Sequence, residues 1–305
     1  MTVFLLLAAH FCSNIFSIIL HKKCSNALSA RGNAGKAVYV LITGIFSGLL
    51  YLAYSGFTLE LNRTAVIFAF IYGICSTVVA LTVTIYKYVD VATVNVTKTS
   101  LNLIVSSLVG FLIFSEPVTE NRLLKLTLTF CVVFLVFFSN RKGIRKTNSG
   151  DLSAPKDRSN FLHFLLLIAI QIPVFAFGAY QSKLIAKYDA IPDLNSYYCL
   201  TNVFMVLFGT VWVLVLASKD KDNIKECLAI VRSKDLFTML LLMAFGTVNA
   251  ILSVVILKYM DISLYSPLSS VLSFIGSTLV SLIFREKLSK FIWIAVIISI
   301  IVVIL

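Results

Sequence analysis

Two stretches of this chain resemble each other closely enough to constrain the fold before anything else is considered. They cover residues 87–137 and 258–305. Each opens with Lys-Tyr-x-Asp, continues as an apolar segment rich in small residues, reaches Phe-x-Glu and ends in a second apolar run. The opening lysines are 171 positions apart, and the glutamates, Glu116 and Glu286, are 170 positions apart. An offset of just over half of the 305 residues predicts two copies of one structural unit.

The composition indicates a membrane protein. Hydrophobic residues make up 59% of the chain and charged residues only 13%, whereas soluble domains carry about 25% charged residues. A helix needs about 20 apolar residues to cross a bilayer. Segments of about that length recur along the whole chain and predict ten spans, at Val3–Leu20, Ala37–Tyr54, Ala65–Tyr86, Thr93–Phe114, Leu123–Ser139, Leu162–Ala179, Ser196–Leu216, Leu236–Leu257, Ser263–Phe284 and Phe291–Leu305.

The ten spans divide into two sets of five. Residues 1–140 form the first predicted repeat, and residues 161–305 form the second. Residues 141–160 are polar and basic, contain Gly, Ser and Pro, and are interpreted as a flexible linker. Because five is odd, the second repeat must enter the membrane from the opposite side. The predicted fold is therefore an all-α membrane protein with ten transmembrane helices in two inverted five-helix repeats, an arrangement typical of secondary transporters.

The net charge of +12 is explained by the loops between spans rather than by a nucleic-acid partner. Nineteen of the 26 Lys and Arg residues lie in or beside the loops that follow the first, third, fifth, seventh and ninth spans, and six in or beside the other loops. Positive residues concentrate in cytoplasmic loops. This count predicts that both termini lie outside. A short surface helix is expected at Asn223–Val231 within one of the basic loops.

One basic residue, Lys98, falls well inside a predicted span, whereas the other Lys and Arg residues lie outside the spans or at their edges. A lysine at hydrocarbon depth is costly and is a functional hypothesis by default. Asn95 and Asn102 lie three residues before it and four residues after it, which places the three side chains on one helical stripe. We expect this stripe to line a central solute cavity. The alternative is that Lys98 extends its side chain to the membrane surface.

Three further segments supply candidate cavity residues. His10 and Asn14 share a polar stripe in the first span, and His10 could also relay protons. Gln171 lies at mid-depth in the sixth span, where Pro173 predicts a kinked or broken helix. Tyr265 lies at the start of the ninth span and completes the candidate set. The alternative for each is hydrogen bonding between helices inside the bundle.

Other polar residues in the spans are interpreted as structural. A stripe of small residues in the ninth span favours close packing between helices, a packing seam, over ligand contact. The stripe consists of Ser266, Ser269, Ser270, Ser273 and Ser277, and its counterpart in the fourth span is Ser106, Ser107 and Gly110. Glu116 and Glu286 each end a span at a tight turn, where a carboxylate can accept hydrogen bonds from backbone N–H groups at the next helix start.

The segment 268–289, with its small-residue helix, aliphatic run, Glu and short turn before a last apolar helix, resembles the end of an EamA-type repeat of the drug/metabolite transporter superfamily. The resemblance implies a basket of ten helices around a central cavity and transport of small solutes without ATP. It also implies cytosolic termini, contrary to the loop count. The first repeat departs from the pattern, with Lys98 where the second has Pro267, which hints at an anionic group on the substrate.

The leading functional hypothesis is a secondary transporter of small polar metabolites or amino acids, located in a bacterial plasma membrane. The alternatives are a nucleotide-sugar or phosphate-linked antiporter, which would need more cavity cations than Lys98 alone, and a non-transporting membrane scaffold. No catalytic cluster, cofactor motif or metal-ligand spacing is evident, so an enzyme is not expected. The expected partners are a small solute, the lipid bilayer and, as an open alternative, a second copy of the chain.

Overall fold

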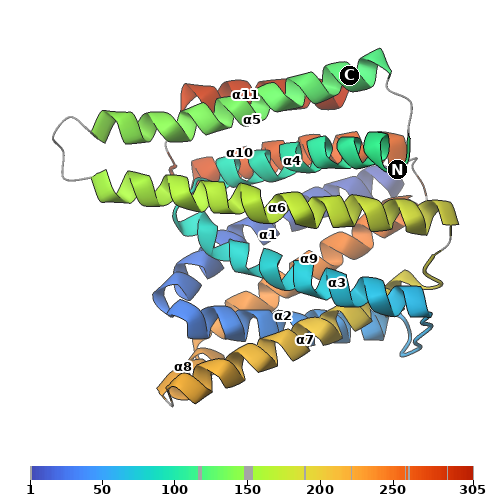
Figure 1. Cartoon of the computed structure of the whole chain (residues 1–305), viewed down its shortest axis with the longest axis vertical. Coiled ribbons are helices and arrows are strands. Elements are labelled where there is room, and N and C mark those ends of the chain that lie inside the picture. Colours follow the sequence, from blue (N-terminus) through green and yellow to red (C-terminus); the bar gives the residue numbers. More distant parts are fainter. Residues whose placement is uncertain are drawn as a thin grey trace. The chain divides into compact units, whose positions relative to one another are not determined.

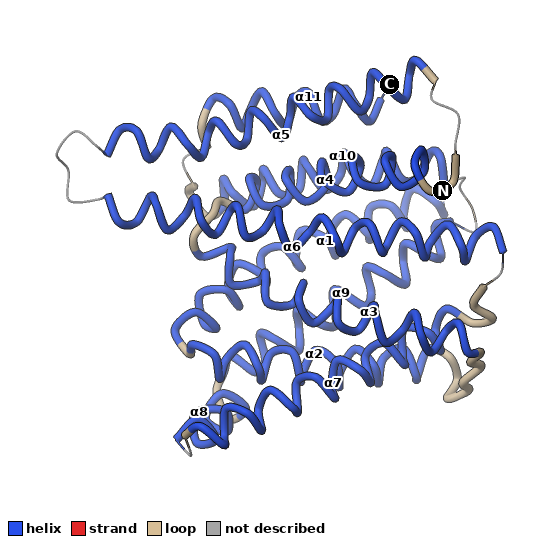
Figure 2. Tube along the Cα trace, in the orientation of Figure 1, coloured by secondary structure: helices blue, strands red, loops and turns tan. Residues whose placement is uncertain are grey.

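The computed structural model describes residues 2–115, 119–147, 154–188, 190–220, 222–257, 259, 262–286 and 288–304. These residues are helical apart from short connections and contain no strand, which confirms the all-α prediction for this part of the chain (Figures 1 and 2). The elements are α1 (Thr2–Ala30), α2 (Gly32–Tyr54), α3 (Arg63–Leu81), the 3-10 helix η1 (Thr82–Lys87), α4 (Val91–Leu112), α5 (Glu120–Thr147), α6 (Ala154–Tyr188), α7 (Leu194–Lys219), α8 (Asp222–Val231), α9 (Lys234–Leu257), α10 (Ile262–Ile283) and α11 (Lys290–Ile304).

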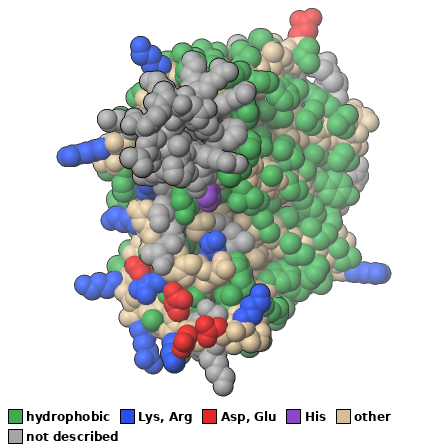
Figure 3. Space-filling model, turned by 60° about the vertical axis from the view of Figure 1, so that its left-hand side comes forward, with side chains coloured by type: hydrophobic (Ala, Val, Ile, Leu, Met, Phe, Trp, Pro, Cys, Tyr) green, Lys and Arg blue, Asp and Glu red, His purple; other side chains and the backbone are tan. Residues whose placement is uncertain are grey.

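Several of these helices have the length and composition needed to cross a bilayer. Within the described residues there are six such segments, in α1, α2, α3 with η1, α6, α7 and α9. Three shorter apolar segments lie in α5, α10 and α11. Large hydrophobic side chains remain exposed along many of the helices, and Figure 3 shows them as a broad continuous area with few charges in it. Such an area suits contact with lipid and is compatible with a multi-pass membrane protein.

The central polar segment is more helical than the sequence suggested. Helix α5 continues to Thr147 and α6 begins at Ala154, so both helices extend into the predicted flexible linker 141–160. The Lys and Arg residues at the end of α5 are good helix formers, and Pro155 stands in the first turn of α6, where its missing N–H is not needed. Of the predicted linker, residues 148–153 lie outside the described part of the chain.

The third span also differs from the prediction of one helix to residue 86. The α-helix ends at Leu81, and Thr82–Lys87 form a 3-10 helix. β-Branched threonines restrict the side-chain rotamers of a helix. The Thr82 hydroxyl donates to the Val79 carbonyl at 2.7 Å, and the Thr84 carbonyl accepts from the Ser25 hydroxyl at 3.1 Å.

The chain divides into two compact units. Unit 1 comprises Met1–Ile18, Ile85–Ala179 and Leu252–Leu305, and unit 2 comprises Ile19–Thr84 and Tyr180–Ile251. Each unit takes segments from both sequence halves, because the dividing points fall inside α1, η1, α6 and α9. The compact units therefore differ from the sequential repeats that the sequence predicts.

In unit 2, α2 and α7 pack closely and run antiparallel. A Cβ atom added at Gly44 would lie 2.9 Å from the Asn202 carbonyl oxygen and 2.9 Å from the Val206 amide nitrogen. One added at Gly209 would lie 3.0 Å from the Leu41 amide nitrogen. Residues with higher numbers in α2 therefore contact residues with lower numbers in α7, as in an antiparallel pair. Glycines at this contact let the two backbones approach, as small residues do between membrane helices.

We predict that Gly44→Ala destabilises the protein by about 1–3 kcal/mol, because the new methyl group meets backbone atoms that cannot rotate away. Gly246→Ala in α9 is the matched control, since nothing lies within 4 Å of its added Cβ. Alanine favours helix over glycine by about 1 kcal/mol, so this variant should be neutral or more stable. Thermal unfolding of both purified variants in detergent measures the difference. Equal midpoints for the two variants would contradict the close contact.

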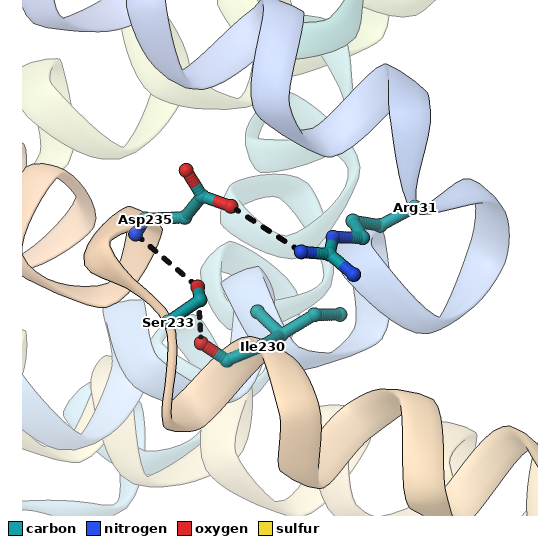
Figure 4. A network of polar contacts seen from close by, with 4 residues as sticks. All are labelled: Arg31, Ile230, Ser233 and Asp235. Carbon is teal, nitrogen blue, oxygen red and sulfur yellow. Dashed lines mark hydrogen bonds and ion pairs between the residues drawn. The ribbon is translucent and has the colours of Figure 1, made fainter.

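The predicted surface helix at Asn223–Val231 is confirmed as α8, and a short polar turn joins it to α9 (Figure 4). The Ser233 hydroxyl donates to the Ile230 carbonyl at 2.7 Å and accepts from the Asp235 N–H at 3.2 Å. The Asp235 carboxylate lies 3.9 Å from the Arg31 guanidinium. Both side chains are about one-third exposed (38% and 35%), so this ion pair contributes little to stability, and the serine hydrogen bonds define the turn.

Asp193 begins α7. Its carboxylate accepts hydrogen bonds from the Ser196 N–H at 2.7 Å, the Ser196 hydroxyl at 2.6 Å and the Asn195 N–H at 3.2 Å. Burial by itself raises the pKa of the Asp193 carboxyl, but the hydrogen bonds from Ser196 and Asn195 outweigh it and hold that pKa below its ordinary value. The ionised carboxylate is therefore a stabilising cap of α7.

We predict that Asp193→Ala lowers the free energy of unfolding by about 1 kcal/mol at neutral pH. Because the folded pKa is depressed, the contribution is fully present above the unfolded pKa of about 3.9 and is lost as the pH falls through the folded pKa. The stability difference between wild type and variant should therefore shrink in acid. Unfolding midpoints measured from pH 7 to pH 3 test this, and a difference that grows in acid would be incompatible with the cap.

In unit 1, α4 and α10 also run antiparallel, because the first turn of α4 meets the end of α10. The Glu286 carboxylate accepts the Val91 N–H at 2.9 Å and the Ser281 hydroxyl at 2.7 Å. The Ser281 hydroxyl oxygen accepts the Ala92 N–H at 2.9 Å. The expected hydrogen bonding to a helix start is present, but the helix is α4 and not the next helix, α11. Glu116 lies outside the described residues.

Candidate functional site

Lys98 lies in the second turn of α4 against a tyrosine. Its ammonium nitrogen is 5.3 Å from the centre of the Tyr86 ring, a cation–π arrangement. The Tyr86 hydroxyl donates to the Asn95 side-chain oxygen at 3.1 Å. Tyr86 is buried, whereas Lys98 and Asn95 are half-buried. The structure thus brings together two of the predicted stripe residues and adds an aromatic residue from η1.

Asn102 continues the stripe one turn further along α4. Its side chain is exposed, and its amide oxygen lies 3.3 Å from the Ser106 hydroxyl, which donates to it. An exposed amide and a half-buried ammonium on one helix face are poorly suited to lipid. This face is better suited to a watery space or to polar partners.

The candidates of the first span occupy a helix contact. His10 is buried, and its Nε2 atom is 3.5 Å from the Ser269 hydroxyl of α10. A Cβ atom added at Gly276 of α10 would lie 3.3 Å from the Ile15 side chain, so the side chains of α1 also reach α10 at this point. Asn14, one turn after His10, is half-buried. Ser269 of the predicted seam thus contacts α1, and a packing role for the other seam serines stays a prediction.

Gln171 is 2% exposed, and its amide nitrogen has no hydrogen-bond partner among the residues that the structure describes. It shares the buried face of α6 with Phe164 and Leu167. The broken helix predicted at Pro173 is not observed, since α6 continues through this residue. Tyr265 belongs to α10, but its side chain is outside the described part of the structure.

A group of tyrosines in unit 2 was not singled out by the sequence. Tyr51 stacks on Tyr198 at 5.3 Å between ring centres, and Tyr72 stacks on Tyr197 at 6.2 Å. The Tyr197 hydroxyl donates to the Gln181 side-chain oxygen at 2.5 Å. Tyr197 is fully buried, and the rings pack on one another. The adjacent pair 197–198 was visible in the sequence, but only the fold reveals its partners on α2 and α3.

Among the described residues, no group of three or more His, Cys, Asp or Glu side chains gathers as a metal site would require. A comparison with known protein-family models gave no match, and a comparison with curated proteins gave none either. The class that the structure defines is therefore a helical protein with several apolar helices long enough to cross a membrane, and with a polar cluster on α4.

Proposed function

We propose that this chain is a secondary transporter that moves small polar metabolites or amino acids across a cell membrane by alternating access. In this proposal the six long apolar segments combine with α4, α5, α10 and α11 to give ten spans in two inverted repeats. Equivalent helices of inverted repeats must run in opposite directions. The antiparallel packing of α2 on α7 and of α4 on α10 supports this relation.

Reciprocal contacts add support for an internal two-fold relation. Gly44 packs on Val206, and Gly209 packs on Leu41. Leu41 and Val206 are 165 positions apart, and so are Gly44 and Gly209. Each glycine therefore contacts the residue equivalent to the one that the other glycine contacts, as expected across a two-fold axis.

The backbone before the paired glutamates also favours a repeat. Ser115 and Arg285, 170 positions apart, both have positive φ, at 51° and 55°. This conformation is uncommon outside glycine. The boundaries between the two compact units recur at nearly the same offset. Ala179 lies 161 positions after Ile18, and Ile251 lies 167 positions after Thr84. Offsets that rise steadily along the chain are expected of a duplication with short insertions.

The observation that carries the transport function is the cluster of Lys98, Asn95 and Tyr86 in α4 and η1. Burying a cation and an amide at membrane depth costs free energy, and a chain that serves only as a membrane anchor or scaffold gains nothing in return. In membrane proteins such residues mark solute pathways. Alternating access also requires that one site can open to each side of the membrane in turn. Two similar, antiparallel repeats meet this requirement, because they can exchange conformations.

Uptake into proteoliposomes tests the proposal. Purified full-length protein is reconstituted, and radiolabelled amino acids, organic acids, sugars and sugar phosphates are offered one class at a time. We expect saturable uptake of at least one class, faster than in protein-free liposomes and accelerated by the same unlabelled solute inside. Absence of flux for every class would reject transport and favour the scaffold alternative.

A further inference from the structure

We infer that the surface around α8 binds the headgroups of anionic phospholipids at the edge of the bilayer. This inference goes beyond the proposed function, because it requires only that α7 and α9 cross a membrane. Five exposed side chains define the α8 surface. They are Leu228 and Val231 of α8, together with Lys219, Arg232 and Lys234, which flank this helix.

The connections of α8 place it at the surface of the bilayer. The apolar segment of α7 ends at Lys219 and that of α9 begins at Lys234, so α8 joins two candidate spans. Only positions 220–221 and 232–233 separate α8 from these spans. The three Cα–Cα steps across either connection reach about 11 Å at most. The headgroup region is about 5–8 Å deep on each side of the hydrocarbon core. Both ends of α8 are therefore held in or near this region.

The side chains of α8 point into two different environments. Cys227 and Ile230 are buried in an apolar core with residues of α1, α2 and α9. In Figure 1, α8 lies beside α2 and α7, which it contacts. Leu228 and Val231, by contrast, are 51% and 43% exposed. A surface helix that exposes apolar side chains beside basic ones is typical of a helix that lies among the headgroups of a membrane.

The exposed charges around α8 are predominantly positive. In the described part of residues 218–235, the exposed charged residues are the cations Lys219, Lys225, Arg232 and Lys234 and the anions Asp220 and Asp222. Lys225 pairs with Asp222 at 2.8 Å, so three cations remain against one anion. Arginine binds a phosphate group through two parallel hydrogen bonds, and lysine binds it as a point charge. Each basic residue near an anionic bilayer strengthens the attraction about fivefold.

Other partners fit this surface less well. A zwitterionic phospholipid carries no net charge to match the excess of cations. A free phosphate ion would match the cations but would leave Leu228 and Val231 in water. A soluble protein would have to displace headgroups to reach a helix that lies among them. An anionic phospholipid supplies a negative phosphate and an apolar chain together, which is the combination that the α8 surface presents in complementary form.

Thermal unfolding of the purified full-length protein in detergent tests the choice of lipid. Dioctanoyl phosphatidylglycerol is the anionic probe, dioctanoyl phosphatidylcholine has the same chains without net charge, and glycerol 3-phosphate is the free headgroup. We expect phosphatidylglycerol, at about ten times its dissociation constant, to raise the unfolding midpoint at least about 2 °C more than either other probe. This difference should shrink between about 0.01 M and about 1 M salt, because the Debye length falls from about 30 Å to about 3 Å.

Matched variants assign the preference to the α8 surface. The double variant Arg232→Gln/Lys234→Gln should weaken the affinity for phosphatidylglycerol at least about tenfold, because two of the basic residues are lost. Leu228→Ser should weaken the affinity for both phospholipids, because it removes an apolar contact. Arg63→Gln is the control and should leave the preference unchanged. Ala80 of α3 packs against the same apolar core as α8, so exposed Arg63 at the start of α3 lies about 25 Å away.

An added tryptophan reports whether the exposed face of α8 meets lipid. Leu228→Trp is reconstituted in phosphatidylglycerol nanodiscs that contain a phospholipid brominated near the headgroup end of its chains. Its fluorescence is compared with that of the wild type, in which Trp212 and Trp293 supply the background. We expect the added tryptophan to be quenched by bromine.

Four results would overturn the inference. They are equal stabilisation by the two phospholipids, full stabilisation by glycerol 3-phosphate, a preference that persists in Arg232→Gln/Lys234→Gln, and an unquenched tryptophan in Leu228→Trp. The last result would direct this face of α8 to water and so to a soluble partner. None of these measurements involves solute flux, so their failure leaves the proposed transport function to its own test.

Discussion

Replacement of Lys98 by methionine is expected to lower the initial rate of solute uptake at least about tenfold. Methionine keeps the length and apolar stem of the side chain but removes the charge and three donors. A hydrogen bond to a charged group contributes about 1.5–3 kcal/mol, and 1.4 kcal/mol corresponds to a factor of ten. The contact with Tyr86 is also lost as a cation–π pair. Uptake per reconstituted protein molecule is the measurement.

The yield of folded Lys98→Met protein should not fall, because removal of a charge from an apolar helix does not oppose membrane insertion. Lys98→Arg should retain part of the uptake, since it keeps the charge but changes its geometry. Lys225→Met on exposed α8 should transport like wild type. Uptake by Lys98→Met at the wild-type rate, at equal protein density, would remove Lys98 from the solute site.

Replacement of Glu286 by alanine is expected to cause the largest loss of stability, about 2–4 kcal/mol. The carboxylate accepts the Val91 N–H and the Ser281 hydroxyl, and alanine leaves both donors without this acceptor. An unsatisfied buried donor costs about 1–3 kcal/mol. The positive end of the α4 dipole also loses its negative partner. The midpoint of thermal unfolding in detergent should therefore fall by several degrees.

Two comparisons isolate the contact between α10 and α4. Glu286→Gln keeps an oxygen acceptor and should lose less stability than Glu286→Ala. A double-mutant cycle with Ser281→Ala should show that the two changes are not additive, because the side chains share one hydrogen-bond network. Asp222→Ala, at an exposed residue that pairs with exposed Lys225, should change the midpoint little. Equal effects of the Asp222 and Glu286 variants would contradict this account.

Much of the secondary structure was predictable from apolar segment length. Every predicted span falls on a helix of the structure, apart from a few end residues, because long apolar runs can satisfy their backbone only as helices in a membrane. The errors occur where polarity was taken to mean a loop. The ends of α5 and α6 are polar yet helical, since Lys and Arg are good helix formers and their charges need only reach water.

The candidate site was predictable in part. The spacing of Asn95, Lys98 and Asn102 along one helix identified the stripe, because residues three and four apart share a helix face. Tyr86 could not be assigned to it, since the 3-10 turn that returns its ring to α4 has no pattern of its own. Of the two outcomes predicted at Pro173, the broken helix is absent, because neighbouring groups in a membrane helix can compensate for the missing N–H of proline.

By itself, the sequence determined the helical class, the apolar segments suited to a membrane, and the similarity between residues 87–137 and 258–305. These properties depend on neighbours along the chain, which periodicity and hydropathy record. Only the tertiary structure decided that Glu286 meets the start of α4, 195 residues earlier, and that Gly44 lies against α7. Such contacts depend on which helix faces pack together, and many pairings of apolar helices bury similar surfaces, so the amino-acid pattern does not distinguish among them.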